Sequence, residues 1–367
     1  MLFKEIPGLH TLKDTLIHSV SANHIAHAQL FVGHPGGVGL PMALAYATYL
    51  NCTDKQENDA CGRCSSCLKM NKLAHPDVMY ILPTAGGKKV LSENLMKEWR
   101  EFVQHSPFSS LSDWLTHAQL KQGNIPVEEA RQLVQKLALK AYEGDYKIVI
   151  IWSAEFLHNT TSNALLKLLE EPPSQTIFLL VTTERDKILP TITSRTQTVS
   201  IPQLSDNDIQ EYLINTLQVP DFVAQEITFL ADRNLQKAIQ LIDNEPDDTH
   251  SFFVEWMRYC FGQALEKLVP MAELFDAKTK EQQKTIIEYS LNMYRELLIW
   301  VAVGEDLSRL QGDTRSFIDK FSKAIRTESL EQVTEILNEA YFHLERNVRA
   351  KIIFLDISWK ISQLIRK

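Results

Sequence analysis

Short apolar segments recur through residues 1–201 of this chain and alternate with amphipathic helical patterns, and this alternation most constrains the fold. Three of the segments are nearly continuous apolar runs, at residues 27–32, 147–152 and 176–182. A strand without polar alternation is buried on both faces, as in a parallel sheet that helices cover on each side. The first half of the chain is therefore predicted to be an α/β domain with a parallel sheet.

Helical patterns fill the intervals between these strands, at residues 12–20, 41–50, 127–141 and 160–171. Beyond residue 202 only helical patterns follow, and a polar segment with a proline interrupts them at residues 244–248. The fold class is thus α/β followed by all-α. We predict three domains, an α/β domain (1–201), a small helical domain (202–245) and a larger helical domain (246–367).

Four of the five cysteines lie close together in the spacing C-x8-C-x2-C-x2-C, at Cys52, Cys61, Cys64 and Cys67. A C-x2-C pair directs two thiolates to one metal from a tight turn, and four thiolates make a closed site of the structural kind. We predict one structural Zn²⁺ in this module (52–67), where it replaces a hydrophobic core. The alternative is a set of free or partly oxidised thiols, since a chain in a reducing compartment does not build a disulfide framework.

Composition argues against two classes of protein. The net charge of −8 provides no global basic field for nucleic acid, although a local basic patch is compatible with it. The sequence has no uninterrupted apolar run of about 18 residues, which a membrane span requires. Its first residues lack the layout of a signal peptide. We expect a cytoplasmic protein without membrane contact.

A glycine-rich loop follows the first apolar strand, with glycines at Gly33, Gly36, Gly37 and Gly39. It has the position of a phosphate-binding loop, G-x-x-x-x-G-K-[ST], whose lysine reaches the phosphates and whose hydroxyl holds Mg²⁺. Counted from Gly33, Gly39 stands at the lysine position and Leu40 at the hydroxyl position; a shift of one residue gives Leu40 and Pro41. Neither register supplies the two groups, so we predict that this loop does not bind ATP productively.

The apolar strand at 147–152 also lacks the residues of a hydrolase. In such an enzyme the strand tip carries an aspartate for the metal, followed by a glutamate that positions water. Trp152 and Ser153 occupy those places, and Glu155 lies past the expected end of the strand. Because glycine loops are common, the loop alone would not indicate a nucleotide-binding fold. That interpretation requires a third motif in addition to the loop and this strand.

Two further segments supply that motif. Residues 163–173 have the sequence NALLKLLEEPP, and residues 189–196 have the sequence LPTITSRT, which contains Ser194 and Arg195. With the glycine loop and the cysteine cluster, this ordered set resembles the clamp-loader branch of the AAA+ ATPases over roughly residues 3–201. Within that branch it is most similar to the δ′ type of bacterial DNA polymerase III. The γ/τ type has the same cysteine module and Ser-Arg motif but needs intact phosphate-binding residues.

The resemblance implies an AAA+ module with an inserted zinc module, a small helical lid domain and a C-terminal helical collar domain that joins an oligomer. It implies a subunit of the DNA polymerase III holoenzyme that takes part in clamp loading during DNA replication and is not an enzyme on its own. The implied partners are the γ/τ and δ subunits, with the sliding clamp and primer-template DNA reached through the complex.

The resemblance also assigns roles to single residues. In that family the Ser-Arg motif carries an arginine finger, which reaches the γ-phosphate held by the adjacent subunit. Carried onto this sequence, Arg195 is the finger in trans, Ser194 is its neighbour, and Thr196 replaces the family's usual cysteine. The residues at the nucleotide-sensing positions are Thr182, Thr183 and Gln236, where Gln236 replaces the arginine of an active member.

Two other functions stay open at this point, an active γ/τ-like ATPase with an atypical phosphate loop and a zinc-stabilised nucleic-acid-binding protein. Without the resemblance, Arg195 would be interpreted as an ordinary surface arginine. Cys260 lies in a helical pattern and is predicted to be a small buried hydrophobic residue. His75 and Asp77 are predicted to shape a turn rather than to perform chemistry.

Overall fold

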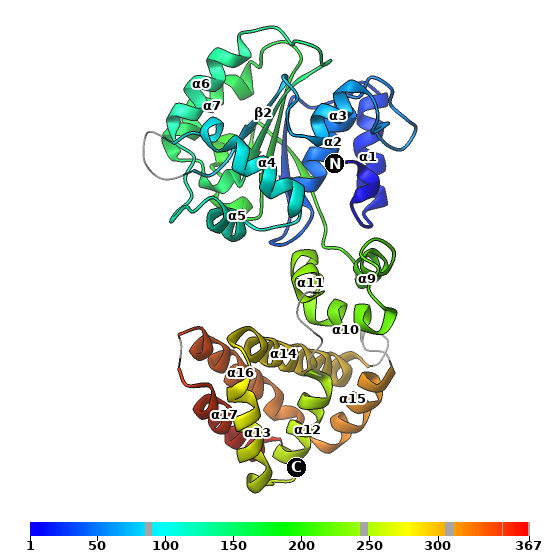
Figure 1. Cartoon of the computed structure of the whole chain (residues 1–367), viewed down its shortest axis with the longest axis vertical. Helices are drawn as coiled ribbons and strands as arrows, with labels where there is room; N and C mark the ends of the chain where they lie inside the picture. Colours follow the sequence, from blue (N-terminus) through cyan, green and yellow to red (C-terminus); the bar gives the residue numbers. More distant parts are fainter. Residues whose placement is uncertain (85–89, 243–248, 305–311, 347, 366–367) are drawn as a thin grey trace. The chain divides into compact units, whose positions relative to one another are not determined.

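The computed structural model describes residues 1–84, 90–242, 249–304, 312–346 and 348–365 (Figure 1). These residues form two compact units. The first contains Met1–Leu217 and Arg233–Ile239, and the second contains Gln218–Asp232 and the residues from Gln240 onward. The predicted linker at 244–248 lies outside the described residues, and the division into three domains stays a prediction.

A five-stranded sheet forms the centre of the first unit, in the order β2-β3-β4-β1-β5. The strands are β1 (Ala28–Val32), β2 (Val78–Ile81), β3 (Lys147–Trp152), β4 (Thr176–Thr182) and β5 (Gln197–Ser200). Every pairing between them is parallel, so the carboxyl ends of all five strands lie at the same edge. The predicted parallel sheet is confirmed, and β1, β3 and β4 are the three predicted strands. The strands β2 and β5 were not predicted from the sequence.

Helices cover both faces of this sheet, because alternate residues of a buried strand point to opposite sides. On one face, Leu133 of α6 and Leu165 of α7 pack in one cluster with Val149 and Phe178 of the sheet. On the other face, α2 contacts β1, β3 and β4. The helices of this unit are α1 (His10–Ser21), α2 (Gly39–Leu50), α3 (Ser65–Asn71), α4 (Met96–His105), α5 (Leu111–His117), α6 (Val127–Leu137), α7 (Asn159–Glu170), α8 (Pro190–Thr193) and α9 (Asp206–Asn215).

Helix α6 ends four residues before the predicted end at Ala141. The ammonium group of Lys147, at the start of β3, donates to the carbonyl oxygens of Leu137 and Leu139 at 2.7 and 3.0 Å. A lysine that binds the free carbonyls at a helix C-terminus stabilises that end. The prediction was wrong at this boundary because the contact comes from a residue outside the helix.

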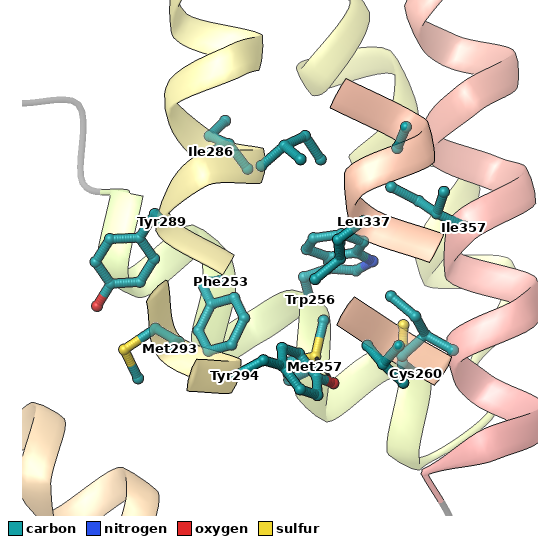
Figure 2. Close-up of a cluster of buried hydrophobic side chains, with 14 of the residues drawn as sticks. Phe253, Trp256, Met257, Cys260, Ile286, Tyr289, Met293, Tyr294, Leu337 and Ile357 are labelled. Carbon is teal, nitrogen blue, oxygen red and sulfur yellow. Dashed lines mark hydrogen bonds between the residues drawn. The ribbon is translucent and has the colours of Figure 1, made fainter. Parts of the chain in front are cut away.

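The second unit is a set of packed helices around one aromatic core (Figure 2). Phe253, Trp256 and Cys260 of α12 point into this core, and all three are fully buried. The indole N–H of Trp256 donates to the hydroxyl of Ser358 at 2.8 Å, which satisfies its one donor. The helices of this unit are α10 (Asp221–Ala231), α12 (Thr249–Phe261), α13 (Leu265–Ala277), α14 (Lys280–Val303), α15 (Gly312–Ala324), α16 (Leu330–Glu345) and α17 (Ala350–Leu364).

Helix α11 (Leu235–Ile242) begins in the segment that belongs to the first unit. The prediction that Cys260 is buried among hydrophobic residues is confirmed. None of the helices in the described part of the chain combines the length and the apolar content that a membrane span requires.

Candidate functional site

The glycine loop joins the carboxyl end of β1 to the first turn of α2, the place where α/β sheets bind phosphate groups. The amide of Gly33 donates to the carbonyl of Thr182 at 3.0 Å, which ties the loop to β4. Gly36 has a φ of +67°, in the left-handed region that favours glycine. The backbone therefore has the sharp turn before a helix N-terminus that a phosphate-binding loop uses.

The side chains that would complete this loop are apolar or missing. Gly39 is the first residue of α2, and a β-carbon there would lie 3.3 Å from Cγ1 of Val181. Leu40 is 5% exposed, so its side chain is part of the core of the unit. The two positions that hold a lysine and a hydroxyl in a phosphate-binding loop thus contribute only to packing here.

An aromatic cluster covers the carboxyl end of β3, where the metal-binding carboxylate of a hydrolase would stand. Trp152 is the last residue of the strand and is 6% exposed. Its ring centroid lies 5.0 Å from that of Trp99 in α4, and Trp99 lies edge-on to Trp114 of α5 at 5.3 Å. Such ring pairs add to the stabilisation that comes from burial alone. The indole of Trp152 is therefore a packed core group that offers no metal ligand.

Residues at the start of α11 contact the glycine loop. The amide of Gln236 donates to the carbonyl of Gly36 at 3.1 Å, and the side-chain amide of Asn234 donates to the carbonyl of Pro35 at 3.3 Å. A β-carbon added to Gly36 would meet the side-chain oxygen of Asn234 at 2.1 Å. The side-chain amide of Gln236 also donates to a carboxylate oxygen of Asp113 in α5. Gln236, predicted to replace a sensing arginine, is thus bound to protein groups.

The polar residues at the end of β4 are also engaged within the chain. Thr182 is 1% exposed, and its hydroxyl accepts a hydrogen bond from the amide of Glu184 at 3.1 Å. The hydroxyl of Thr183 donates to Oε1 of Glu155 at 3.2 Å. Since β3 ends at Trp152, Glu155 lies past the strand end, as the sequence analysis expected.

The four clustered cysteines meet at one point. The sulfur atoms of Cys52, Cys61, Cys64 and Cys67 all lie within 4.8 Å of one another, and those of Cys61 and Cys67 are 3.9 Å apart. A tetrahedral site with Zn–S bonds of about 2.3 Å places its sulfur atoms about 3.8 Å apart. The spacing and the ligand type therefore fit a zinc ion held by four thiolates.

Backbone amides in the cysteine module point at the sulfur atoms. The amides of Cys61, Cys64 and Cys67 donate to the sulfur atoms of Cys52, Cys61 and Cys64, at 3.4, 3.3 and 3.4 Å. Burial opposes ionisation of the Cys64 thiol, but hydrogen bonds from Thr53 and from the Cys67 amide outweigh it and lower its pKa to about 6. A thiolate is the form that binds metal, so these donors favour the binding form of Cys64, whereas burial raises the pKa of the Cys52 and Cys67 thiols.

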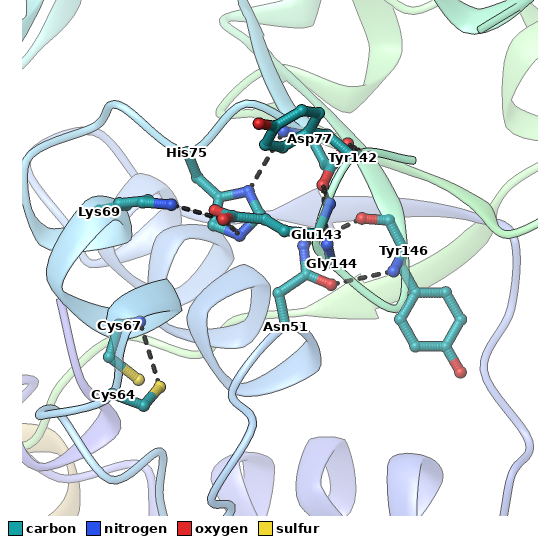
Figure 3. A network of polar contacts seen from close by, with 10 residues as sticks. All are labelled: Asn51, Cys64, Cys67, Lys69, His75, Asp77, Tyr142, Glu143, Gly144 and Tyr146. Carbon is teal, nitrogen blue, oxygen red and sulfur yellow. Dashed lines mark hydrogen bonds and ion pairs between the residues drawn. The ribbon is translucent and has the colours of Figure 1, made fainter. Parts of the chain in front are cut away.

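A buried carboxylate beside the cysteine module anchors the segment that leads into β3 (Figure 3). Asp77 is 5% exposed and accepts hydrogen bonds from three consecutive backbone amides. The donors are Tyr142 at 2.5 Å, Glu143 at 2.9 Å and Gly144 at 2.8 Å. The prediction that His75 and Asp77 serve chain geometry agrees with this arrangement.

The same network connects the cysteine module to that segment (Figure 3). Lys69 of α3, the helix that begins after Cys64, binds the carboxylate of Glu143 at 2.5 Å. The other oxygen of Glu143 lies 3.5 Å from Nε2 of His75, whose Nδ1 accepts a hydrogen bond from the Asp77 amide. Burial lowers the pKa of His75, so its imidazole is neutral near pH 7. The network is therefore structural and contains one charged pair.

Arg195 lies on the surface of the first unit, between α8 and β5. Its side chain is 35% exposed and contacts the carboxylate of Glu170, at the end of α7. Ser194 is exposed, whereas Thr196 is buried and donates to the carbonyl of Ile192 at 3.2 Å. A guanidinium at this place is accessible to a group on another molecule.

A family model described as DNA polymerase III, delta subunit, matches residues 8–205 of the 367 residues, which is more than half of the chain. This chain belongs to the DNA polymerase III delta-subunit family. The resemblance to δ′ and γ/τ subunits that the motifs indicated is thereby confirmed. The fold class is confirmed as well, since the parallel sheet and the cysteine cluster are those expected of a clamp-loader AAA+ module.

Curated relatives of known name agree with the family. The δ′ subunits of Escherichia coli and Yersinia pestis are 29% and 33% identical to the chain over 189 and 178 residues. These matches cover 52% and 48% of this chain, and 46% and 42% of the relatives. The γ/τ subunit of Mycobacterium tuberculosis H37Rv is 29% identical over 194 residues, which is 53% of this chain and 27% of that protein. The chain thus matches less than half the length of each of these relatives.

Among solved structures, the chain is similar to a γ-subunit-related protein of Thermotoga maritima. The TM-score is 0.39 at 14% sequence identity, with 96% of this chain and 99% of that chain covered.

Several residues that shape the site were not predicted from the sequence. Trp99 and Trp114 cover the end of β3, Asp113 binds Gln236, and Glu170 binds Arg195. The three residues of α4 and α5 come from helices that were not predicted. Glu170 lies within the segment 163–173, but nothing in that segment indicates its partner, which is 25 residues away in sequence.

Proposed function

We propose that this chain is a non-hydrolysing subunit of a DNA polymerase III clamp loader and that it provides Arg195 to ATP held by a neighbouring γ/τ-type subunit. The observation that carries the proposal is Trp152, packed under Trp99 at the strand end where a hydrolase needs a carboxylate for Mg²⁺. Because the glycine loop also lacks its lysine, the site has neither the carboxylate that binds Mg²⁺ nor the cation that binds the phosphates of ATP.

The position of Arg195 supports the second half of the proposal. An arginine finger acts on charge that develops on the γ-phosphate, and its planar guanidinium suits phosphate oxygens. The side chain of Arg195 is 35% exposed on its own unit, so the group that it serves can be on another subunit. The partners that go with this role are γ/τ-type and δ-type subunits, with the sliding clamp and primer-template DNA bound through the complex.

We further propose that Cys52, Cys61, Cys64 and Cys67 hold one structural Zn²⁺. Four sulfur ligands close the coordination shell, so the ion has no open position for substrate or water. Its role would be to hold residues 52–67 together and to position α3, from which Lys69 contacts Glu143.

The proposal is tested with Arg195→Ala in a clamp loader reconstituted from this chain and the γ/τ-type and δ-type subunits of its own organism. Arg185→Ala is the control, because Arg185 is an exposed arginine of the same unit. Loss of a finger should slow ATP hydrolysis at the neighbouring site by roughly 10³-fold, seen as loss of that site's phase in a single-turnover assay. Equal rates for the two variants would remove the role of Arg195.

The ATPase activity of the purified chain tests whether its own site hydrolyses ATP. We expect no ATP turnover above that of a preparation without the chain. Turnover that persists in Arg195→Ala would identify an active ATPase with an atypical loop. Tight, steeply salt-dependent binding of primed DNA by the chain alone would favour a nucleic-acid-binding protein.

A further inference from the structure

Arg195 is held on its own chain by four contacts. Its Nε donates to Oε1 of Glu170 at 2.6 Å, and its Nη2 contacts the same oxygen. Its Nη1 donates to the carbonyl of Thr191 at 3.0 Å and to the hydroxyl of Ser194 at 3.2 Å. A guanidinium has five N–H donors in one plane. Within the described part of the chain, these contacts occupy four donors and leave one N–H of Nη2.

Glu170 lies at a position where its negative charge does not stabilise its own helix, α7. Glu170 is the last residue of α7, and Glu171 follows it directly. The C-terminal end of a helix carries partial negative charge, so carboxylates there are unfavourable and cations are favourable. Glu170 gains compensation from Arg195, whereas the described contacts give the exposed Glu171 side chain no partner. Because Glu170 does not stabilise α7, we interpret its contact as one that acts on the position of Arg195.

We propose that Glu170 is a latch that keeps Arg195 docked, so that the guanidinium must leave Glu170 before it binds the γ-phosphate in a neighbouring subunit. This inference rests on the role proposed above for Arg195. Two features carry it. The docked guanidinium has one free N–H, whereas a phosphate is bound through two or more. In addition, the contacting carboxylate offsets the positive charge that the phosphate requires.

The interaction between Arg195 and Glu170 must be strong enough to change the rate of hydrolysis and weak enough for a phosphate to displace it. The side chains of Arg195 and Glu170 are 35% and 47% exposed, so water screens their attraction. An exposed pair of this kind shifts an equilibrium by about two- to five-fold. A triphosphate has more negative charge than a single carboxylate, so it replaces Glu170 once the neighbouring subunit is correctly placed. Before that, Glu170 limits premature hydrolysis.

The test compares Glu170→Gln with Glu171→Gln in the reconstituted clamp loader. The first variant keeps the size of the side chain and an acceptor oxygen but removes the charge; the second removes an equivalent charge one residue away. We expect Glu170→Gln to raise ATP hydrolysis in the absence of DNA and clamp about two- to five-fold. The rate with primed DNA and clamp should stay the same, and Glu171→Gln should change neither rate. An unchanged or lower rate without DNA in Glu170→Gln would overturn the latch.

Arg195→Ala separates a failure of the latch from a failure of the proposed function. If Arg195→Ala leaves the DNA-stimulated rate unchanged, the finger role fails and the latch fails with it. If Arg195→Ala lowers that rate but Glu170→Gln has no effect, only the latch fails. The double variant should behave like Arg195→Ala; acceleration by Glu170→Gln in the absence of Arg195 would contradict the latch.

A measurement on the purified chain tests the contact without any ATPase activity. The Nε–H resonance of Arg195 can be assigned by NMR from its loss in Arg195→Lys. We expect its exchange with water to be about two- to five-fold faster in Glu170→Gln than in the unchanged chain, because a charge-assisted hydrogen bond has been weakened. Equal exchange rates in the two proteins would show that Glu170 does not hold the guanidinium.

Discussion

Replacement of Asp77 by asparagine should destabilise the first unit by about 2–4 kcal/mol. The carboxylate accepts the amides of Tyr142, Glu143 and Gly144 at 2.5–2.9 Å and is 5% exposed (Figure 3). A hydrogen bond to a buried charged group contributes about 1.5–3 kcal/mol. Asparagine keeps one acceptor oxygen but turns an NH₂ group toward the remaining amides, so at least one donor loses its partner.

The assay is urea unfolding combined with hydrogen exchange of the peptide that contains residues 140–152. Exchange reports on the anchored segment itself, which is useful because the chain has two compact units that need not unfold together. Asp145→Asn is the matched control. Asp145 lies in the same segment, but its side chain is 70% exposed and pairs with Lys55 at 3.6 Å. The control should change stability by less than about 0.5 kcal/mol.

The effect of Asp77→Asn should depend on pH in a defined way. Burial opposes ionisation of Asp77, but the three amides outweigh it and lower its pKa in the folded protein. Stability from such a group is complete above the unfolded value of about 3.9 and is lost as pH falls through the folded pKa. The difference between the two proteins should therefore be constant from about pH 8 to 5 and shrink only below about pH 4. A variant as stable as Asp145→Asn, or a difference that vanishes above pH 6, would refute this reasoning.

Two further predictions concern the metal and the glycine loop. About one equivalent of zinc should copurify with the chain, and Cys64→Ser should lose it and lower the unfolding midpoint; metal analysis that finds no zinc in the unchanged protein would contradict the site. Gly39→Lys combined with Leu40→Thr should not produce ATP binding tighter than about 1 mM by calorimetry, because the end of β3 still has Trp152 and the new β-carbon meets Val181 at 3.3 Å. Micromolar affinity in that double variant would mean that these two positions alone silence the loop.

Local sequence patterns were sufficient to predict those elements whose pattern lies within one short segment of the chain. The strands β1, β3 and β4 are apolar throughout because they are buried on both faces. The cysteine cluster follows from spacing, since a C-x2-C pair brings its own sulfur atoms together. The family resemblance also rests on short contiguous segments, and the family match over residues 8–205 confirms it.

Elements and contacts that depend on distant residues were not predictable. The strand β5 has the polar sequence Gln-Thr-Val-Ser and is mostly exposed at the edge of the sheet, so no apolar run marks it. The packing of Trp152 on Trp99 joins residues of β3 and α4, and the docking of Arg195 on Glu170 joins two surface segments. Each partner is an ordinary residue in its own segment, and only the fold brings the two together.

The proposed finger role requires the guanidinium of Arg195 to lie at the γ-phosphate when a neighbouring subunit holds ATP. The direct measurement is a cryo-electron microscopy structure of the reconstituted clamp loader with a beryllium fluoride complex of ADP, sliding clamp and primed DNA. We expect that Arg195 has left Glu170 and lies within about 3 Å of the beryllium fluoride in the adjacent subunit. A well-ordered Arg195 still bound to Glu170, with another group at that phosphate position, would contradict it.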